Sequence, residues 1–319
     1  MRCLVLIAFV CLPVHFVGFG PNLASISIID NSIAVGGDGA QDEDERLIGG
    51  AVQRRRTQSA PGDPYRVTGV VKDGRYAPFP KYLSSCGIVL AATQGVPDEF
   101  LVQVGGVIDE ILARRVSLDL TAQRSMVEDL HRYGALLPVP QTERSFERIL
   151  RRNEKAFDRL HEQFSICDII MAQVPDGQVM EVVEHVLHTV TDVGLHYQFP
   201  DDWGLSRQSQ LWVAMQRAID EGFYNVDSYD DLKGEPPEIV DRILLQEFAY
   251  WFITTAWDLQ EPYGPDEEEW TLRTSEELKA KMPKFFDVYQ RTAARVMSPP
   301  SRASLSKIGP PRSEERRRR

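Results

Sequence analysis

The stretch EVVEHVLHTVTDVGLH, from Glu181 to His196, carries three of the six histidines of the chain within twelve residues. If it is drawn as an α-helix, its polar side chains share an arc of roughly 100°. These side chains are Glu181, Glu184, His185, His188 and Asp192. Valine and leucine side chains fill the opposite face, so the pattern predicts an amphipathic helix over residues 177–193.

The polar face of this helix carries metal-ligating residue types at helical spacing. Lys and Arg, which usually populate a solvent-facing surface, do not occur among residues 160–206. Ligands four residues apart lie one above the other on a helix. Three pairs have this spacing: Glu181 and His185, Glu184 and His188, and His188 and Asp192. The face is interpreted either as part of a metal site or as a solvated acidic surface with incidental histidines.

A second helix is predicted over residues 237–257, and its segment ILLQEFAYWFITTAW (243–257) is apolar on nearly every side. Glu247 is the only ionisable carboxylate of this segment. A buried carboxylate is costly unless it is paired, protonated or bound to a metal. Its partner is expected to be either a distant Arg or Tyr, or a metal ion or histidine of the first helix. A pair of ligands on one helix and a glutamate on a later helix is the arrangement of one class of zinc peptidases.

The whole chain predicts an α+β fold, with a small N-terminal sheet followed by a mainly helical half. Strands are expected at residues 65–71, 87–92, 135–139 and 167–174. Further helices are expected at residues 98–114, 118–133, 206–221, 274–281 and 284–296.

Composition places the chain among globular proteins. It has 319 residues, of which 43% are hydrophobic, and a formal net charge of −11. The acidic balance argues against nucleic acid as the main partner. The acidic run at residues 266–269 is expected to be a solvated loop. Cys86 and Cys167 are expected either to form one disulfide or to remain separate thiols.

The two ends of the chain differ in composition from the part expected to fold, residues 65–297. Residues 1–20 resemble a secretory signal peptide, which implies a secreted protein without a membrane span once the peptide is removed. An uncleaved signal anchor is the alternative. Residues 21–64 are interpreted as a disordered leader or linker, and residues 298–319 as a disordered basic tail.

Two motifs resemble the zincin-like proteins related to the catalytic domain of anthrax lethal factor. The family's metal-binding helix reads roughly HEFAHAIHEMGL, and the matching stretch here is EHVLHTVTDVGL, residues 184–195. The family's later helix reads roughly EYWAEGVQSWF, which corresponds to EFAYWFITTAW, residues 247–257. Residues 81–101 and 274–290 also resemble family segments, so the likeness extends over about residues 80–295. The resemblance implies a zincin-like metallopeptidase fold with zinc, or another divalent metal, as its cofactor.

The resemblance assigns Glu184, His188 and Glu247 as the metal ligands, but the chain departs from the family at three positions. Glu184 replaces the first zinc histidine, His185 replaces the general-base glutamate, and Val240 replaces a tyrosine that polarises the substrate carbonyl. A set of two carboxylates and one imidazole favours weaker zinc binding or a different divalent ion. Its negative charge also weakens the activation of water by the metal.

Three neighbouring features complete the expected site. Asp192 falls on an acidic position just after the family's metal-binding motif, where it would support the ligands. The E-x-x-E-H pattern permits a second alignment, in which Glu181 and His185 are ligands and Glu184 is the base. His196 is expected either to join the ligands or to cap or line the loop that follows it.

Three functions agree with these residues. In the first, the chain is a secreted zincin-fold protein that binds a divalent metal and has weak or lost peptidase activity. If the activity is entirely lost, the protein is a pseudoenzyme. In the second, it is an active, atypical zinc metallohydrolase of peptide or protein substrates that uses Glu184 or His185 as the acid–base group. In the third, it is a non-enzymatic binding module whose His and Glu side chains form a structural network.

Overall fold

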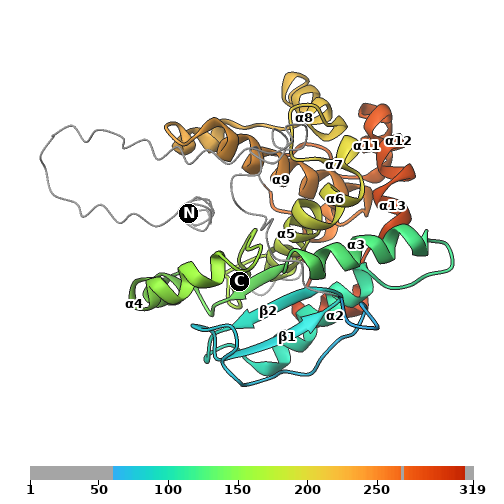
Figure 1. Cartoon of the computed structure of the whole chain (residues 1–319). Helices are drawn as coiled ribbons and strands as arrows, with labels where there is room; N and C mark the ends of the chain where they lie inside the picture. Colours follow the sequence, from blue (N-terminus) through green and yellow to red (C-terminus); the bar gives the residue numbers. More distant parts are fainter. Residues whose placement is uncertain (1–59, 267–268, 313–319) are drawn as a thin grey trace, which may run out of the picture.

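The computed structural model describes residues 60–266 and 269–312. The predicted signal peptide, nearly all of the predicted leader and residues 313–319 lie outside the described residues. The described chain is an α+β structure in which a small three-stranded sheet precedes a mainly helical part. Figure 1 shows the sheet at the bottom of the molecule and the helices of the second half of the chain above it. Within the two described ranges, no helix has the length and hydropathy that a membrane crossing requires.

The sheet has the order β1-β2-β3, with strands β1 (Lys81–Ser85), β2 (Ile88–Ala92) and β3 (Leu136–Val139). β1 and β2 pair antiparallel across a tight turn at Cys86 and Gly87, whose φ angles are 47° and 88°. A Cβ atom on Gly87 would lie 2.8 Å from Leu130 Cβ, so glycine allows this turn to pack closely on a helix. β3 runs parallel to β2. The predicted strands at 87–92 and 135–139 therefore correspond to β2 and β3.

The predicted strand at residues 65–71 is wrong, and β1 takes its expected place in the sheet. The segment lies beside β1, since the Thr68 N–H donates to Ser84 O at 2.9 Å and Val71 exchanges two hydrogen bonds with Tyr82. These isolated contacts do not extend into a ladder. β-branched composition identified a segment that borders the sheet, whereas the strand itself is KYLSS.

The predicted strand at residues 167–174 is also wrong, because prolines in and after β3 prevent regular pairing with this segment. The Ile170 N–H donates to Pro138 O at 3.0 Å, and the Ala172 N–H donates to Pro140 O at 2.9 Å. Proline has no N–H with which to return such bonds, so the pairing stays one-sided. The segment nevertheless runs alongside β3, and it carries Asp168 into the interior.

Two helices, α2 (Asp98–Ile111) and α3 (Leu120–Arg132), connect β2 to β3, and α4 (Glu143–His161) leads from β3 toward the second half of the chain. The first two were predicted at 98–114 and 118–133, whereas α4 was not predicted. α4 begins with a capping box between Thr142 and Ser145, and it buries Phe146, Phe157 and Leu160. Most of its other side chains are charged, so its apolar periodicity is too sparse to stand out in the sequence.

The central helix α5 (Gln178–Thr189) continues through a π-helical segment (Val190–Leu195) into the short helix α6 (His196–Gln198). It packs against α9 (Pro237–Ala256), which is buried over most of its length as predicted. The remaining helices are α7 (Pro200–Trp203), α8 (Gln210–Asp220), α10 (Gln260–Tyr263), α11 (Ser275–Lys281), α12 (Pro283–Arg291) and α13 (Ala293–Val296). The predicted helices at 206–221, 274–281 and 284–296 thus correspond to α8, α11 and the pair α12 and α13.

The predicted start of a disordered tail at residue 298 comes too early. The helix α14 (Arg302–Ile308) packs against α2 and α5, and its Leu305 side chain is fully buried. Glu110 of α2 accepts hydrogen bonds from the hydroxyl groups of Ser301 (3.1 Å) and Ser304 (2.5 Å). Cys86 and Cys167 are both buried, and no disulfide joins them in the described chain.

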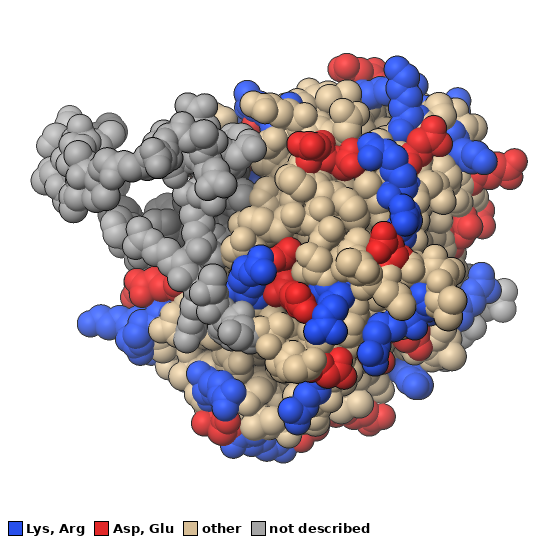
Figure 2. All heavy atoms as spheres, turned by 45° about the vertical axis from the view of Figure 1, so that its right-hand side comes forward, with Lys and Arg blue, Asp and Glu red and all other residues tan. Residues whose placement is uncertain are grey.

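The face of the molecule drawn in Figure 2 mixes the two signs of charge. On the face drawn in Figure 2, Lys and Arg side chains are interspersed with Asp and Glu. The acidic net charge of the chain is therefore not gathered into one broad patch on this face.

Candidate metal centre

Helices α5 and α9 bring together the three residues predicted as metal ligands. Glu184 and His188 lie one turn apart on α5, and Glu247 faces them from α9. One potential ligand atom from each residue lies within 4.8 Å of those from the other two. The Nε2 atom of His188 is 3.7 Å from Oε2 of Glu247. The buried face of each helix positions these polar atoms, because the apolar residues around them pack into one core.

The Nε2 atom of the His188 imidazole is available to bind an ion. Its Nδ1 atom forms a short hydrogen bond with Oδ2 of Asp168, whereas Nε2 is buried and has no hydrogen-bond partner within the described ranges. Ligands of a tetrahedral zinc site lie about 3.3 Å apart, given bonds of about 2.0 Å to the metal. The separation of 3.7 Å between His188 Nε2 and Glu247 is close to this spacing. The residues present therefore fit a divalent cation.

Protonation also suits a ligand at this position. Burial lowers the pKa of His188, so its imidazole is neutral at pH 7. When the single ring proton is on Nδ1 and donated to Asp168, the lone pair of Nε2 points toward the carboxylates. Metal-binding histidines in proteins are commonly oriented by such a carboxylate.

The charges around the carboxylates of Glu184 and Glu247 are mostly negative, and the positive charge of His185 offsets them only in part. Burial raises the pKa of Glu184 to about 8, and nearby carboxylates add to the shift. Burial and the neighbouring Glu184 raise the pKa of Glu247 well above its usual range. No Lys or Arg forms an ion pair with either carboxylate in the part of the chain that the structure describes. A bound divalent cation would provide the missing positive charge and favour the ionised forms of both groups.

This charge arrangement predicts how the stability of the metal-free protein depends on pH. Between the ordinary glutamate pKa of 4.5 and about 8, folded Glu184 and Glu247 bind more protons than the unfolded chain does. The free energy of unfolding should therefore fall as the pH rises from 5 to 8, by roughly 1 kcal/mol per pH unit for each proton held. The raised pKa of His185 acts in the same direction. Denaturant titrations in a chelator measure this slope, and stability that rises with pH would contradict it.

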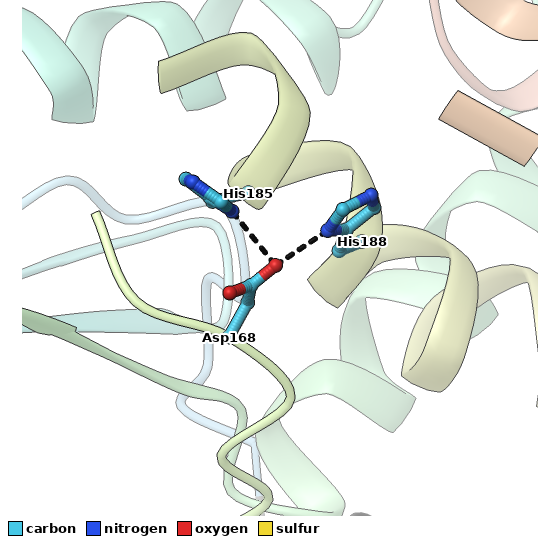
Figure 3. A group of neighbouring side chains, drawn as sticks. All are labelled: Asp168, His185 and His188. Atoms are coloured by element: carbon cyan, nitrogen blue, oxygen red, sulfur yellow. Dashed lines mark hydrogen bonds and ion pairs between the residues drawn. The ribbon is translucent and has the colours of Figure 1, made fainter. Parts of the chain in front are cut away.

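Asp168 connects the two histidines of α5, as Figure 3 shows. Its Oδ2 atom accepts a hydrogen bond from His185 Nδ1 at 2.7 Å and a shorter one from His188 Nδ1. The other nitrogen of His185 lies 3.3 Å from Oε1 of Glu181. Burial opposes charge on all of these groups, but the two flanking carboxylates raise the pKa of His185 well above its usual value. Attraction to His185 and the two hydrogen bonds keep the pKa of Asp168 low despite its burial.

Asp168, His185 and His188 also form a second group whose atoms are close enough to surround an ion. Their distances favour hydrogen bonds instead. The 2.7 Å between His185 Nδ1 and Asp168 Oδ2 is a normal N–H···O distance, shorter than the spacing of about 3.3 Å between ligands that share a zinc ion. This group therefore orients His188, and the first group offers the space for an ion.

The second alignment of the motif, with Glu181 and His185 as ligands, uses groups that already have other partners. Glu181 accepts a hydrogen bond from the Met171 N–H at 2.6 Å and contacts His185. It therefore fastens residues 167–174, the Asp168 segment, to α5. Both ring nitrogens of His185 face carboxylates. A charged imidazole held in this way cannot accept another proton, which disfavours His185 as a general base.

Asp192, which was expected to support the ligands, does not contact them itself. Its Oδ2 atom lies 3.5 Å from Nη1 of Arg242, and burial raises the pKa of this carboxyl group to about 7. Arg242 in turn donates to Gln246 Oε1 at 3.0 Å. The Nε2 atom of Gln246 lies 2.8 Å from His188 Nδ1 and 3.3 Å from Asp168 Oδ2. Asp192 therefore reaches His188 only through a buried chain of side chains, and Asp168 is the carboxylate that binds the histidine.

His196 caps a loop rather than joining the ligands. Its Nδ1 atom accepts a hydrogen bond from the Leu205 N–H at 3.1 Å. The sequence offered both roles, and the structure places the ring against the loop that follows α7.

The carboxylates open onto a cleft of about 660 Å³. Glu184, Glu247 and Tyr250 line it, and Tyr250 lies one turn after Glu247 on α9. Glu269 also lines the cleft, where its Oε1 atom accepts hydrogen bonds from Tyr229 Oη (2.5 Å) and Trp251 Nε1 (3.1 Å). The expectation of a wholly solvated acidic loop is therefore wrong at Glu269, which is buried.

Sequence reasoning missed Asp168 and Glu269. Asp168 is the only charged residue of the apolar run CDIIMAQV, and a single carboxylate in such a run was the available signal. Glu269 precedes Trp270 at the end of an acidic run, and nothing in the sequence distinguishes it from its neighbours. No protein-family model, curated protein or solved structure matches this chain.

Proposed function

We propose that the chain is a secreted, zincin-like protein that binds one divalent cation through Glu184, His188 and Glu247, with weak or lost peptidase activity. One observation carries this proposal. The Nε2 atom of His188 is buried without a hydrogen-bond partner in the described chain, and it faces two carboxylates that lack a Lys or Arg partner. A cation at this point satisfies all three groups at once.

The layout of the elements supports the zincin-like part of the proposal. Two ligands lie one turn apart on α5, and the third comes from α9, which packs against it. A small sheet precedes both helices, and one side of the ligand group opens onto the cleft. One imidazole and two carboxylates are compatible with zinc, and also with harder divalent ions such as Mn²⁺. When bound, such an ion supplies Lewis-acid chemistry.

The side chains around the ligands support reduced peptidase activity. Glu184 serves as a ligand in this arrangement, so it is not available as a general base. His185 is held between Asp168 and Glu181, and Val240 provides no hydroxyl group. A positioned general base accounts for roughly 10²- to 10⁴-fold of a hydrolytic rate, so its loss alone makes turnover slow.

The proposal is tested in two steps on the full chain. Calorimetric titration of the metal-free protein with zinc and with manganese should show one ion per chain. Incubation of the loaded protein with a peptide library should then give no cleavage, or cleavage far slower than that of ordinary zinc peptidases. Rapid metal-dependent cleavage that is lost in His188→Ala would favour an active metallohydrolase. The absence of binding by either metal would remove the basis of the proposal.

A non-enzymatic module with a structural network is the second candidate, and the pairing of Asp168 with both histidines favours it. Such a network holds the Asp168 segment against α5 without any ion. It accounts for His185 and Glu181, but among the described residues it leaves Nε2 of His188 without a hydrogen-bond partner and Glu184 and Glu247 without a Lys or Arg partner. Metal titration therefore separates the two candidates.

A further inference from the structure

The cleft beside the three ligands has an acidic lining, although charges are interspersed on the face drawn in Figure 2. Its six acidic side chains are Glu143, Asp176, Glu181, Glu184, Glu247 and Glu269. Three basic side chains, Arg144, His185 and Arg312, lie on the same walls. Glu181 is paired with His185. Glu143 and Asp176 are exposed at the rim of the cleft, and Glu184 and Glu247 form its floor. The lining as a whole favours a cationic ligand.

The carboxylates on the floor of the cleft also lack a basic partner among the described residues. Glu184 and Glu247 have no Lys or Arg partner in residues 60–266 and 269–312. The buried Tyr250 hydroxyl group lines the same cleft and lies near Gln260 without a hydrogen bond of normal length. An arginine side chain suits this floor, because its planar guanidinium group presents several donors that bind carboxylates in pairs.

The chain itself carries such side chains next to the cleft. Arg312 is the last described residue, and it lines the cleft wall. Its Nη1 atom donates to Gly264 O at 2.9 Å, and Nη2 lies 3.8 Å from Asp266. Residues 313–319 follow with the sequence SEERRRR. Four residues of extended chain span roughly 14 Å. Arg316 and the arginines after it therefore start near the cleft that Arg312, Glu184 and Glu247 all line.

We propose that residues 313–319 dock in this cleft when no metal is bound, with an arginine of the run 316–319 against Glu184 and Glu247. The guanidinium group then occupies the place of the cation, and the other arginines face the acidic rim. Metal and tail compete for the same two carboxylates, so metal loading displaces the tail. The inference rests on the proposed function only for the identity of the competing cation, because docking itself requires no metal.

The test uses a fluorescent peptide of residues 313–319 and the full chain in a chelator at low salt. The first variant carries serine at Arg316, Arg317, Arg318 and Arg319, which leaves the cleft open. We expect the peptide to bind this variant roughly tenfold or more tightly than the wild-type chain, since the tethered tail competes at millimolar effective concentration. Asp176→Asn with Glu143→Gln, added to the first variant, should weaken peptide binding, and added salt should do the same.

A matched variant separates docking from a change in net charge. It carries serine at four exposed basic positions of α4 outside the cleft lining: Arg148, Arg151, Arg152 and Lys155. We expect this variant to bind the peptide as weakly as the wild-type chain does. Equal peptide affinity for the wild-type chain and the tail variant, a gain in the α4 variant, or no binding to any of them would overturn the inference.

Two further readouts identify the occupant and separate it from the proposed function. Zinc titration of the tail variant should show tighter binding than the wild-type chain, and zinc should release the bound peptide. If no metal binds but the peptide result is as expected, docking stands and the proposed function fails. Sedimentation should show one copy per particle. Self-association that is lost in the tail variant would assign the cleft to the tail of a second copy and overturn intramolecular docking.

Discussion

His188→Ala should remove stoichiometric metal binding, with an affinity for zinc at least ~100-fold below that of the wild-type chain. Changes at groups that only orient a ligand typically cost 10- to 100-fold in metal affinity, and this substitution removes the ligand itself. It also leaves Glu184 and Glu247 as the only ligands of the set, and two carboxylates without an imidazole bind zinc weakly. Competition titration against a chromophoric chelator measures the change.

His131→Ala is the matched control for this substitution. His131 is partly buried on α3, and its Nε2 atom lies 2.9 Å from Pro64 O, outside the lining of the cleft. The control should retain wild-type zinc affinity. Thermal unfolding of both variants in a chelator shows whether each is folded. A folded His188→Ala protein that still binds one zinc per chain with wild-type affinity would exclude His188 as a ligand.

Asp168→Asn should destabilise the metal-free protein by about 3–5 kcal/mol, the range expected when one partner of a buried ion pair is removed. Asp168 and His185 are both almost inaccessible to solvent, and their charges compensate each other. Asparagine is neutral, so the substitution leaves the imidazolium of His185 with Glu181 alone. It also weakens the hydrogen bond that orients His188, so zinc affinity should fall by about 10- to 100-fold. Urea titration measures the first effect and metal titration the second.

Asp176→Asn is the control for Asp168→Asn, because it makes the same chemical change at an exposed position eight residues later. Substitutions at such surface positions usually stay within about 0.5 kcal/mol. If Asp168→Asn unfolds at the same urea concentration as this control, the buried ion pair does not hold the Asp168 segment to α5.

The two helices that form the site were predictable because burial leaves a periodic signal in sequence. On α5 the apolar residues repeat every three to four positions, and α9 is apolar on nearly every side. A polar side chain within such a pattern is conspicuous, which is how Glu184, His188 and Glu247 were singled out. We expected these three residues to lie close together because the sequence resembles a known arrangement of ligands. The structure brings their side chains together.

The residues that complete the site left weaker signals. Asp168 lies in a segment that reads as a strand, and its contact with α5 depends on how this segment runs beside β3. Two prolines, Pro138 and Pro140, keep that segment out of the sheet, which is a long-range effect that no local pattern records. Glu269 resembles a solvated residue because its hydrogen-bond partners, Tyr229 and Trp251, come from distant parts of the chain.

Two helices, α4 and α14, were also not predicted, because the contacts that hold them in place leave little signal in the sequence. Helix α4 buries few side chains, so its charged surface hides its periodicity. Helix α14 was assigned to a disordered tail on composition, but a single buried leucine, Leu305, and the serines that bind Glu110 dock it on α2. Short helices are stabilised by tertiary contacts more than by their own sequence, so composition alone predicts them poorly.

The central claim is that Glu184, His188 and Glu247 surround one divalent cation. The most direct test is a crystal structure of the full chain grown with zinc, with anomalous diffraction recorded on both sides of the zinc absorption edge. We predict one anomalous peak about 2.0–2.2 Å from His188 Nε2 and from an oxygen of each carboxylate. A peak between Asp168 and the Nδ1 atoms of the two histidines, or no peak at either position, would contradict the claim.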